Sequence, residues 1–599
     1  MSTISTFILS LVLTLPGHDI IPDFSRVGYK WGDAPIPELE IKAVILQEDL
    51  KKGLRRYGDT TAFIQSVLDR VGRSGGGAVV LGEGVWNISR PLWIDQDNVV
   101  LRGQSREGTV LKGNSILQMP LICMGKAVAC NPDKPLAGNQ VAIDGRVMGI
   151  SRLRANDAHG SYSIYLMRYN MAAAPGNASG RSPVDAPVVY SGSPGVPVKD
   201  PGAFETGDRI CICWNPSDEW FSDIKMDRIA SNGREAPNGT KQWNEPKRRK
   251  SFNMKWERIV TGIEGNILLL DAPLVMRLDA AYGQAFVEKT SSPRISGSGV
   301  ENISLDSSYD PDIKDGKGRC VDESHSWVGV DVANAEHCWV RNVTSRHLGY
   351  ALVDLRRGAK CISVLDCTCL EPVSVVSGAR RYAFCITKGE LCLFKNCVCD
   401  SDRHSFVTNG CVQGPNVFTN CKSTNSLSDI GPHQSWATGC LFDRIDTDGD
   451  INVQDRGSYG TGHGWAGANF VLWNCEIGGK VSCQSPWVSA LNYAVGCSGL
   501  KYEGRKYGRM FKGILYEDAA SKETGQFPDG MWRPDGQWYP ARKIGETAQG
   551  MVSLPCKDAE LPEWWPVLSL DAYDNPLSLY ECQLQDRHAA GVKLDAFAK

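Results

Sequence analysis

The sequence predicts an all-β solenoid, a parallel β-helix, and three observations carry this prediction. Seven short strand-like segments recur between residues 299 and 477. Each has Asn, Asp or Arg at one fixed position, with apolar residues two places before it and one place after it. The fixed positions follow one another at intervals of 24 to 40 residues, a range typical of solenoids.

The fixed polar position predicts a bend in every coil. Side chains alternate between the two faces of a strand, so positions −2 and +1 can both point inward only if the chain turns at the polar residue. Asn tolerates such a corner, and its amide can bond to the equivalent residue of the next coil. The residues at this position are Asn302, Asn342, Asp366, Asn396, Asn420, Arg444 and Asn474.

Cysteine is frequent in this repeat, and the chain has 21 cysteines in all. Four of them follow the polar position directly: Cys367, Cys397, Cys421 and Cys475. Small, soft thiols suit a narrow interior, so we expect a buried stack there instead of a disulfide network, with a single disulfide between neighbouring coils as the alternative. Pairs such as Cys211 and Cys213 place two thiols on one face of a strand. This pattern favours packing of the thiols in the core over a metal site.

Composition limits the classes of function. The chain has 599 residues, 22% of them charged, and a net charge of −3, so it lacks the overall basic character of a nucleic-acid binder. Residues 7–15 form an apolar run too short to span a bilayer. This run predicts a signal peptide and a secreted, extracellular protein with no membrane partner, although a buried N-terminal strand is the alternative.

Two further segments resemble a known family. The segment YGDTTAFIQSVLDRV (57–71) resembles the Gly-Asp-x-Thr-x-x-x-Gln opening of many right-handed parallel β-helix proteins in the pectate-lyase-like superfamily, and residues 75–104 resemble their first coils. The resemblance implies a right-handed parallel β-helix with an N-terminal capping helix. It implies action on polysaccharides less specifically, because the fold serves lyases, hydrolases, epimerases and binding proteins.

The repeat also suggests how the chain is organised. Residues 160–250 break the pattern and are rich in Pro and Gly, and the repeat fades after residue 500 in an aromatic, turn-rich segment. We therefore expect a signal peptide at 1–18, a cap with the first coils at 19–150, an insertion or small β subdomain at 151–285, the main coils with the active groove at 286–500, and a loop-rich C-terminal cover at 501–599.

A column of cationic residues precedes the strands. In six segments a His or Arg stands one to three residues before an aromatic residue, and equivalent positions of a solenoid stack above one another. The column predicts a cationic groove for an acidic polysaccharide, although coil-stacking aromatics and hydrogen-bonded histidines at bends would give the same pattern. The column begins at His325 and His347. Our catalytic candidates are His404, His433, His463, Arg403 and Tyr382. Our substrate-binding candidates are Arg346, His347, Arg356, Arg380, Arg381, Arg456, Trp436 and Trp465.

These residue types favour a polysaccharide lyase. β-Elimination on a uronate needs a base for the C5 proton and a group that neutralises the carboxylate, and His and Arg supply both. A glycoside hydrolase is the alternative through Asp402, Asp429 and Asp455. The Gly-His-Gly triplet around His463 is similar to that of polygalacturonases, but the Asp-Asp pair of that group is missing.

An epimerase or a non-catalytic carbohydrate-binding β-helix also stays open. We assign no metal ligands and no cofactor, although the acidic segment 305–323 offers oxygen ligands that suit Ca²⁺. We expect a monomer whose partner is the polysaccharide, with no nucleic-acid partner.

Overall fold

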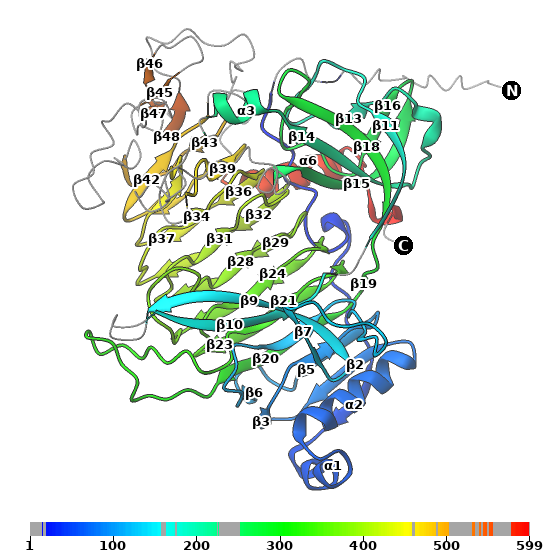
Figure 1. The fold of residues 1–599 in the computed structure, drawn as a ribbon, viewed down its shortest axis with the longest axis vertical. Coiled ribbons are helices and arrows are strands. Elements are labelled where there is room, and N and C mark those ends of the chain that lie inside the picture. Colours follow the sequence, from blue (N-terminus) through cyan, green and yellow to red (C-terminus); the bar gives the residue numbers. More distant parts are fainter. Residues whose placement is uncertain are drawn as a thin grey trace, which may run out of the picture.

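The protein is described by a computed structural model (Figure 1). It describes Leu15 and residues 19–156, 163–173, 176–224, 226, 252–457, 462–486, 489–501, 530–532, 538–540, 543–547, 550–554 and 577–597. The expected signal peptide lies outside the described residues except for Leu15, as does most of the expected C-terminal cover. Within the described part of the chain, no helix is long and apolar enough to cross a membrane.

The core of the molecule is a right-handed parallel β-helix, which confirms the predicted fold class. Its coils stack from the blue end of the chain to the yellow end in Figure 1, and each coil contributes strands to three faces. The first face holds β1 (Ile41–Ile45), β2 (Gly77–Leu81), β5 (Val99–Gly103), β20 (Gly299–Ser307), β23 (Trp339–Arg346), β26 (Ser363–Leu365), β29 (Leu393–Lys395), β32 (Asn416–Thr419), β36 (Cys440–Asp443), β40 (Val471–Trp473) and β43 (Tyr493–Val495).

The other two faces follow the same order of coils. The second holds β3 (Gly84–Ile88), β6 (Thr109–Gly113), the ends of β20 and β23, β27 (Thr368–Leu370), β30 (Val398–Asp400), β33 (Lys422–Thr424), β37 (Asp446–Thr447) and β41 (Glu476–Ile477). The third holds β4 (Leu92–Ile94), β7 (Pro120–Met124), β21 (Val328–Val332), β24 (Ala351–Leu355), β28 (Phe384–Ile386), β31 (Phe406–Thr408) and β34 (Gly431–Pro432). A smaller parallel sheet continues it through β38 (Ile451–Val453), β42 (Lys480–Cys483) and β44 (Leu500–Lys501). Two further short parallel sheets lie just before the strands of the first face: β19 (Ile295–Ser296), β22 (Ala335–Glu336) and β25 (Ala359–Lys360), and β35 (Ala437–Thr438) and β39 (Gly467–Ala468).

The predicted corner between the first two faces is present in every repeat. All seven polar residues have a positive φ between 47° and 57°, the left-handed conformation that turns the chain. The amide of Asn342 donates to Asn302 at 2.6 Å, that of Asn396 to Asp366 at 2.9 Å and that of Asn420 to Asn396 at 2.7 Å. The amides therefore form a ladder from coil to coil, as the repeat predicted.

The predicted cysteine stack is also present. Cys367, Cys397, Cys421 and Cys475 are at most 1% exposed and belong to the hydrophobic core of the solenoid. All described cysteines are free thiols. The excess of cysteine thus fills the interior of the narrow coils.

Two helices lie at the N-terminal end of the solenoid: α1 (Leu50–Tyr57) and α2 (Thr60–Arg73). The carboxylate of Asp59 accepts a hydrogen bond from the amide of Ala62, which caps the start of α2. The apolar stripe of α2, including Ile64 and Leu68, packs into the core of the first coils. The helix therefore covers the open end of the core (Figure 1).

The chain leaves the solenoid after β7 and returns at β20, which pairs in parallel with β5 and β6. The excursion forms two larger antiparallel sheets, a short antiparallel pair of β12 (Val188–Val189) and β17 (Leu278–Asp279), and a short helix, α3 (Asp218–Asp223). One sheet holds β8 (Gln140–Ile143), β9 (Arg146–Asn156) and β10 (Ser163–Met171). The other sheet, here called the insert sheet, holds β11 (Asn177–Pro183), β18 (Gly283–Ser291), β14 (Arg209–Pro216), β15 (Met254–Glu264), β16 (Ile267–Leu270) and β13 (Gly195–Pro197).

The two ends of the described chain cover the first face. Helix α6 (Leu579–Ala589) packs through Leu579 and Tyr580 against the outer side chains of β32, β36 and β40. The hydroxyl of its capping residue, Ser578, bonds to the buried carboxylate of Asp443. The N-terminal segment adds Phe24 and Val27 to the same apolar layer. Neither helix α6 nor the N-terminal segment covers the third face, where the cationic column lies.

Candidate functional site

The structure brings the five catalytic candidates together on the third face of the solenoid. We call Tyr382, Arg403, His404, His433 and His463 the Tyr–His cluster. Nε2 of His433 lies 3.1 Å from the hydroxyl oxygen of Tyr382, and Nη1 of Arg403 donates to the same oxygen at 3.3 Å. The ring of His433 lies 4.9 Å from the ring of His404 and 4.9 Å from that of His463, measured between centroids.

The stacking of coils explains this arrangement. Tyr382 and His404 stand two residues before β28 and β31 and are opposite each other in the strand register, so one coil places its residue above the other. His433 directly follows β34, opposite Asn409, and joins the cluster from the other end of its strand. Arg381 turns the chain with a φ of 55°, and its carbonyl accepts hydrogen bonds from the amides of Arg403 and His404 on the next coil. The Tyr382 side chain reaches across the ring of His404, at 4.9 Å, to His433 on the second coil above.

Burial sets the protonation states of the cluster. Tyr382 is 3% exposed and His433 is 8% exposed. Burial, the neighbouring His404 and the cation of Arg456 hold the pKa of His433 well below its ordinary value. Burial raises the pKa of Tyr382, against the opposing effect of Arg403. At neutral pH a neutral imidazole and a protonated phenol therefore share this hydrogen bond, and the phenol oxygen accepts another from a guanidinium.

Asp429 orients the next histidine of the cluster. Its carbonyl oxygen accepts from Nδ1 of His404 at 2.5 Å, so His404 carries its proton on Nδ1. Burial lowers the pKa of His404 to about 3. Nε2 of His404 consequently holds a lone pair and has no hydrogen-bond partner among the described residues. The carboxylate of Asp429 accepts from Nη1 of Arg456 at 3.0 Å.

Two other carboxyl groups near this register are buried. Burial raises the pKa of Asp402 well above its ordinary range, and the pKa values of the interior thiols of Cys369 and Cys399 are raised first by their own burial and then by nearby Asp402. Asp402 therefore lies on the side of the solenoid core. Burial raises the pKa of Asp455 to about 7, against a hydrogen bond from the amide of Gly457.

The predicted cationic groove is largely neutralised by the protein itself, which corrects the expectation of a free line of positive charge. Its cations bond to carboxylates of the same or a neighbouring coil. The pairs are Arg346 with Glu371, His347 with Asp306 and Glu371, Arg356 with Asp354, Arg380 with Glu323, and Arg456 with Asp429. The sequence did not indicate these counter-ions, because they occupy no regular position in the repeat.

Arg403 and Arg381 differ from the other arginines of the column. Arg403 is partly exposed and forms no ion pair with any described residue. Arg381 is buried and donates to the backbone carbonyls of Ser374 and Ser401. Of the two guanidinium groups, only that of Arg403 is therefore placed to bind the carboxylate of a ligand.

The two tryptophans predicted to bind substrate lie elsewhere. Trp436 is wholly buried and Trp465 is 5% exposed, and both belong to the core between the solenoid and the insert sheet. The ring of Trp436 packs edge-on against Trp220 at 4.8 Å. These rings hold the insert sheet to the solenoid and are not open to a ligand in this structure.

A cavity of about 280 Å³ lies on the same side of the solenoid. Arg381 and Ser401 line it, and they stand one and two residues before Tyr382 and Arg403. Tyr309 and His347 form another part of its wall, with ring centroids 4.9 Å apart. Sequence reasoning missed Tyr309, which lies in the long loop after β20 and outside the repeat.

The acidic segment 305–323 uses its carboxylates within the protein. Asp306 bonds to His347 and Lys112, and Asp315 bonds to Arg319. Asp322 accepts from the backbone amides of Asp310 and Ser324. The segment does not gather its oxygens around one point among the described residues.

No protein-family model and no curated protein matches this chain. Among solved structures, the tailspike gp49 of Pseudomonas phage LKA1 is similar at 14% identity and a TM-score of 0.35; the match covers 80% of this chain and 62%, less than two thirds, of the tailspike. The gp54 tailspike of Acinetobacter baumannii bacteriophage AP22, solved with a capsular saccharide, matches at 9% identity and a TM-score of 0.25, over 76% of each chain. Pectin methylesterase PemA from Erwinia chrysanthemi matches at 11% identity and a TM-score of 0.23, over 81% of this chain and 98% of the esterase.

Proposed function

We propose that this protein is a secreted enzyme that cleaves an acidic, uronate-containing polysaccharide by β-elimination, with the Tyr–His cluster as its acid–base centre. The observation that carries the proposal is the Tyr382 hydroxyl, held between Nε2 of His433 at 3.1 Å and Nη1 of Arg403 at 3.3 Å. A proton acceptor, a proton donor and a cation thus meet at one oxygen. Elimination from a uronate requires these three groups.

The proposed reaction moves one proton from carbon to oxygen. Arg403 binds the uronate carboxylate and disperses the charge that develops on it. With Nε2 of neutral His433 donating to the Tyr382 oxygen, Nδ1 removes the proton from C5, the electrons of that C–H bond form the C4=C5 double bond, and the C4–O bond breaks. Tyr382 gives its proton to the leaving oxygen. Transfer of the proton from His433 to Tyr382 along their hydrogen bond then restores both groups.

The remaining histidines support this centre. His404, fixed by the Asp429 carbonyl, packs edge-on against the rings of both Tyr382 and His433, at 4.9 Å from each. His463 lies on the other side of His433. Because both are buried beside His433, they favour its neutral form, the form that a base requires.

Glycoside hydrolysis is the second candidate, and one observation favours it. Burial raises the pKa of Asp455 to about 7, a value suited to a general acid near neutral pH. Hydrolysis also needs a second, ionised carboxylate. The carboxylate of Asp429 is already bonded to Arg456, so the Tyr–His cluster is the better supported centre.

One assay separates the candidates. The full chain is incubated with a panel of polyuronates and sulfated polysaccharides, and two products are measured. β-Elimination gives an unsaturated uronate that absorbs in the ultraviolet, with one new reducing end for each cleavage. Hydrolysis gives reducing ends without that absorbance. Binding to the panel without any cleavage would leave a carbohydrate-binding β-helix and would contradict both reactions. Sedimentation of the same sample tests the expected monomer.

A further inference from the structure

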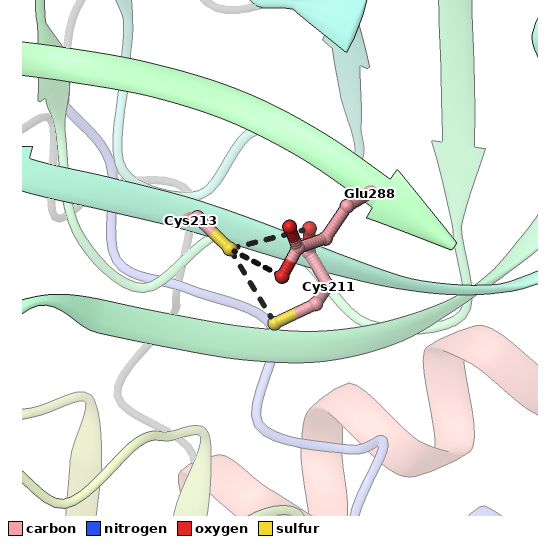
Figure 2. A group of neighbouring side chains, drawn as sticks. All are labelled: Cys211, Cys213 and Glu288. Carbon is pink, nitrogen blue, oxygen red and sulfur yellow. Dashed lines mark hydrogen bonds between the residues drawn. The ribbon is translucent and has the colours of Figure 1, made fainter. Parts of the chain in front are cut away.

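Two thiols and a carboxylate meet on the insert sheet, away from the Tyr–His cluster. Cys211 and Cys213 lie two residues apart on β14, so their side chains point to the same side of the strand. Glu288 stands opposite Cys211 on the antiparallel strand β18. The Sγ atoms of the two cysteines are 3.8 Å apart, and Sγ of Cys213 lies 3.6 Å from Oε1 of Glu288 (Figure 2). All three ligand atoms lie within 4.8 Å of one another.

These distances match a tetrahedral zinc ion. With Zn–S bonds of about 2.3 Å and tetrahedral angles, two thiolate sulfurs stand about 3.8 Å apart. With a Zn–O bond of about 2.0 Å, a carboxylate oxygen stands about 3.5 Å from each sulfur. The observed separations of 3.8 and 3.6 Å are close to these values, and the third separation, from Sγ of Cys211 to the carboxylate, is within 4.8 Å. Thiolate with carboxylate, in a tetrahedral set, selects Zn²⁺ over Ca²⁺ or Mg²⁺.

The surroundings provide access and charge balance. Cys211 and Glu288 line a cavity of about 360 Å³ between the insert sheet and the solenoid, and Lys255 lines it too. Nζ of Lys255 lies 3.1 Å from Oε1 of Glu288. Two thiolates, one carboxylate and Zn²⁺ carry a net charge of −1, which Lys255 neutralises. A charged partner that holds a ligating carboxylate in place is typical of metal sites.

Other thiol pairs of the chain lack these features. The pair Cys397 and Cys399 lies inside the core of the solenoid, at 0% exposure. Among the described residues, only the group of Cys211, Cys213 and Glu288 brings three potential ligands together. The thiols of this group have the ring of Phe286 as their apolar neighbour and the cavity on the open side.

We propose that Cys211, Cys213 and Glu288 bind one Zn²⁺ ion, with the fourth position taken by water from the cavity. Binding releases one proton from each thiol, because the thiolate is the ligand. The ion ties β14 to β18 and so stabilises the insert sheet beside the solenoid. The proposal concerns a metal site that the polysaccharide reaction does not use.

The test uses the full chain with its thiols reduced by a phosphine and its metals removed. Titration with Co²⁺ should give a thiolate-to-metal charge-transfer band and the intense visible bands of tetrahedral Co²⁺, saturating at one equivalent, and Zn²⁺ should abolish them. C211S and C213S should lose the bands. E288Q should weaken Zn²⁺ binding at least about 10-fold, and K255M by up to about 10-fold. C320S, which removes a lone thiol elsewhere, should bind as the unaltered chain does.

A second measurement needs no variant, in case a cysteine change prevents folding. Zn²⁺ should protect Cys211 and Cys213 of the unaltered chain from alkylation, as read by mass spectrometry, while the reactivity of Cys320 stays the same. The proposal is overturned if the Co²⁺ bands are absent from the reduced chain, if they persist in the C211S/C213S double variant, or if Zn²⁺ leaves the alkylation of both cysteines unchanged. Unchanged affinity in E288Q would overturn the carboxylate as a ligand.

Discussion

The hydroxyl oxygen of Tyr382 and Nε2 of His433 share a hydrogen bond across 3.1 Å, although 51 residues separate the two in the sequence. The contact spans two coils, because the Tyr382 side chain crosses the ring of His404 on the coil between them. Two such groups in direct contact can exchange a proton without a mediating water. The predictions on catalysis follow from this pair and from the guanidinium that faces it.

Removal of the Tyr382 hydroxyl should abolish the acid step and leave the fold intact. We expect Y382F to lower kcat by about 10²- to 10⁴-fold with little change in KM, because the phenyl ring keeps its packing but has no proton to donate. The matched control is Y350F. Tyr350 is the adjacent ring on the coil below, at 5.2 Å, and its hydroxyl contacts the thiol of Cys385. Full activity in Y382F, or an equal loss in Y350F, would exclude Tyr382 as the acid.

Arg403 should govern the binding of the substrate carboxylate. We expect R403A to raise KM strongly and R403K to restore it in part, because an ammonium keeps the charge but not the two parallel N–H groups. R346A is the control, since Arg346 is already paired with Glu371 at 2.6 Å and should change KM little. Kinetics on the best substrate of the panel check this prediction. If R346A and R403A behave alike, Arg403 has no special role.

The pH dependence of stability should report on His404. Burial lowers the pKa of His404 to about 3, against about 6.5 in an unfolded chain. Between these values the unfolded chain binds a proton that the folded chain does not, so stability is complete above pH 6.5 and falls as the pH decreases. The slope for one histidine approaches about 1.4 kcal/mol per pH unit.

The variant H404F isolates this contribution. Asp402 and Asp455 titrate in the opposite sense, because burial raises their pKa values, but both are present in the two proteins compared. Unfolding midpoints are measured between pH 7.5 and 5. The midpoint of H404F should fall less steeply than that of the unaltered chain over this range, and parallel curves would mean that His404 titrates normally in the folded state.

How far the sequence predicts this molecule depends on whether a feature is periodic. Asn396 and Asn420 could be assigned to a ladder, and Cys397 and Cys421 to the interior, because each coil repeats the same local chemistry. Tyr382 and His404 align in the same way, whereas His433 stands opposite Asn409 in the strand register, so the repeat alone does not explain its contact with His404.

What the sequence did not predict lies outside the repeat. Glu323 and Glu371 pair with arginines of the column from irregular loop positions. The sequence therefore did not predict that the positive charge of the groove is neutralised. Trp436 was expected to face a ligand, because a repeat shows which residues align but not what covers them. The insert sheet covers Trp436. The placement of that sheet against the solenoid depends on contacts between residues about 200 positions apart in the sequence.

A buried network of charges joins the insert sheet to the solenoid, and its loss should be costly. The carboxylate of Glu257 on β15 accepts from both terminal nitrogens of Arg294, at 2.8 and 2.9 Å, and lies 3.4 Å from Nζ of the wholly buried Lys360. Burial alone would raise the pKa of Glu257, but Lys360 and Arg294 outweigh it and lower that pKa.

We therefore expect E257Q to destabilise the protein by about 3–5 kcal/mol, because it leaves a buried ammonium without its counter-ion. The E257L/K360M double variant should recover much of the loss, since it removes both charges together. E371Q is the control; its carboxylate is exposed, and the change should cost at most about 1 kcal/mol. Thermal unfolding measures all three. If E257Q and E371Q destabilise equally, the network does not hold the insert sheet.

Arg444 is the one residue of the corner position without an Asn or Asp side chain, and it offers a gain in stability. It adopts a φ of 55°, a conformation that costs most L-residues about 1–2 kcal/mol and Asn less. Asn420 on the preceding coil already donates to Asn396 at 2.7 Å. We expect R444N to donate in the same way to Asn420, to extend the ladder by one step and to stabilise the protein by about 1 kcal/mol. R444A, which relieves no strain and adds no hydrogen bond, should be neutral or destabilising. The midpoint of urea unfolding, at an unchanged slope, measures the difference, and a midpoint for R444N at or below that of R444A would show that the amide ladder does not stabilise the coils.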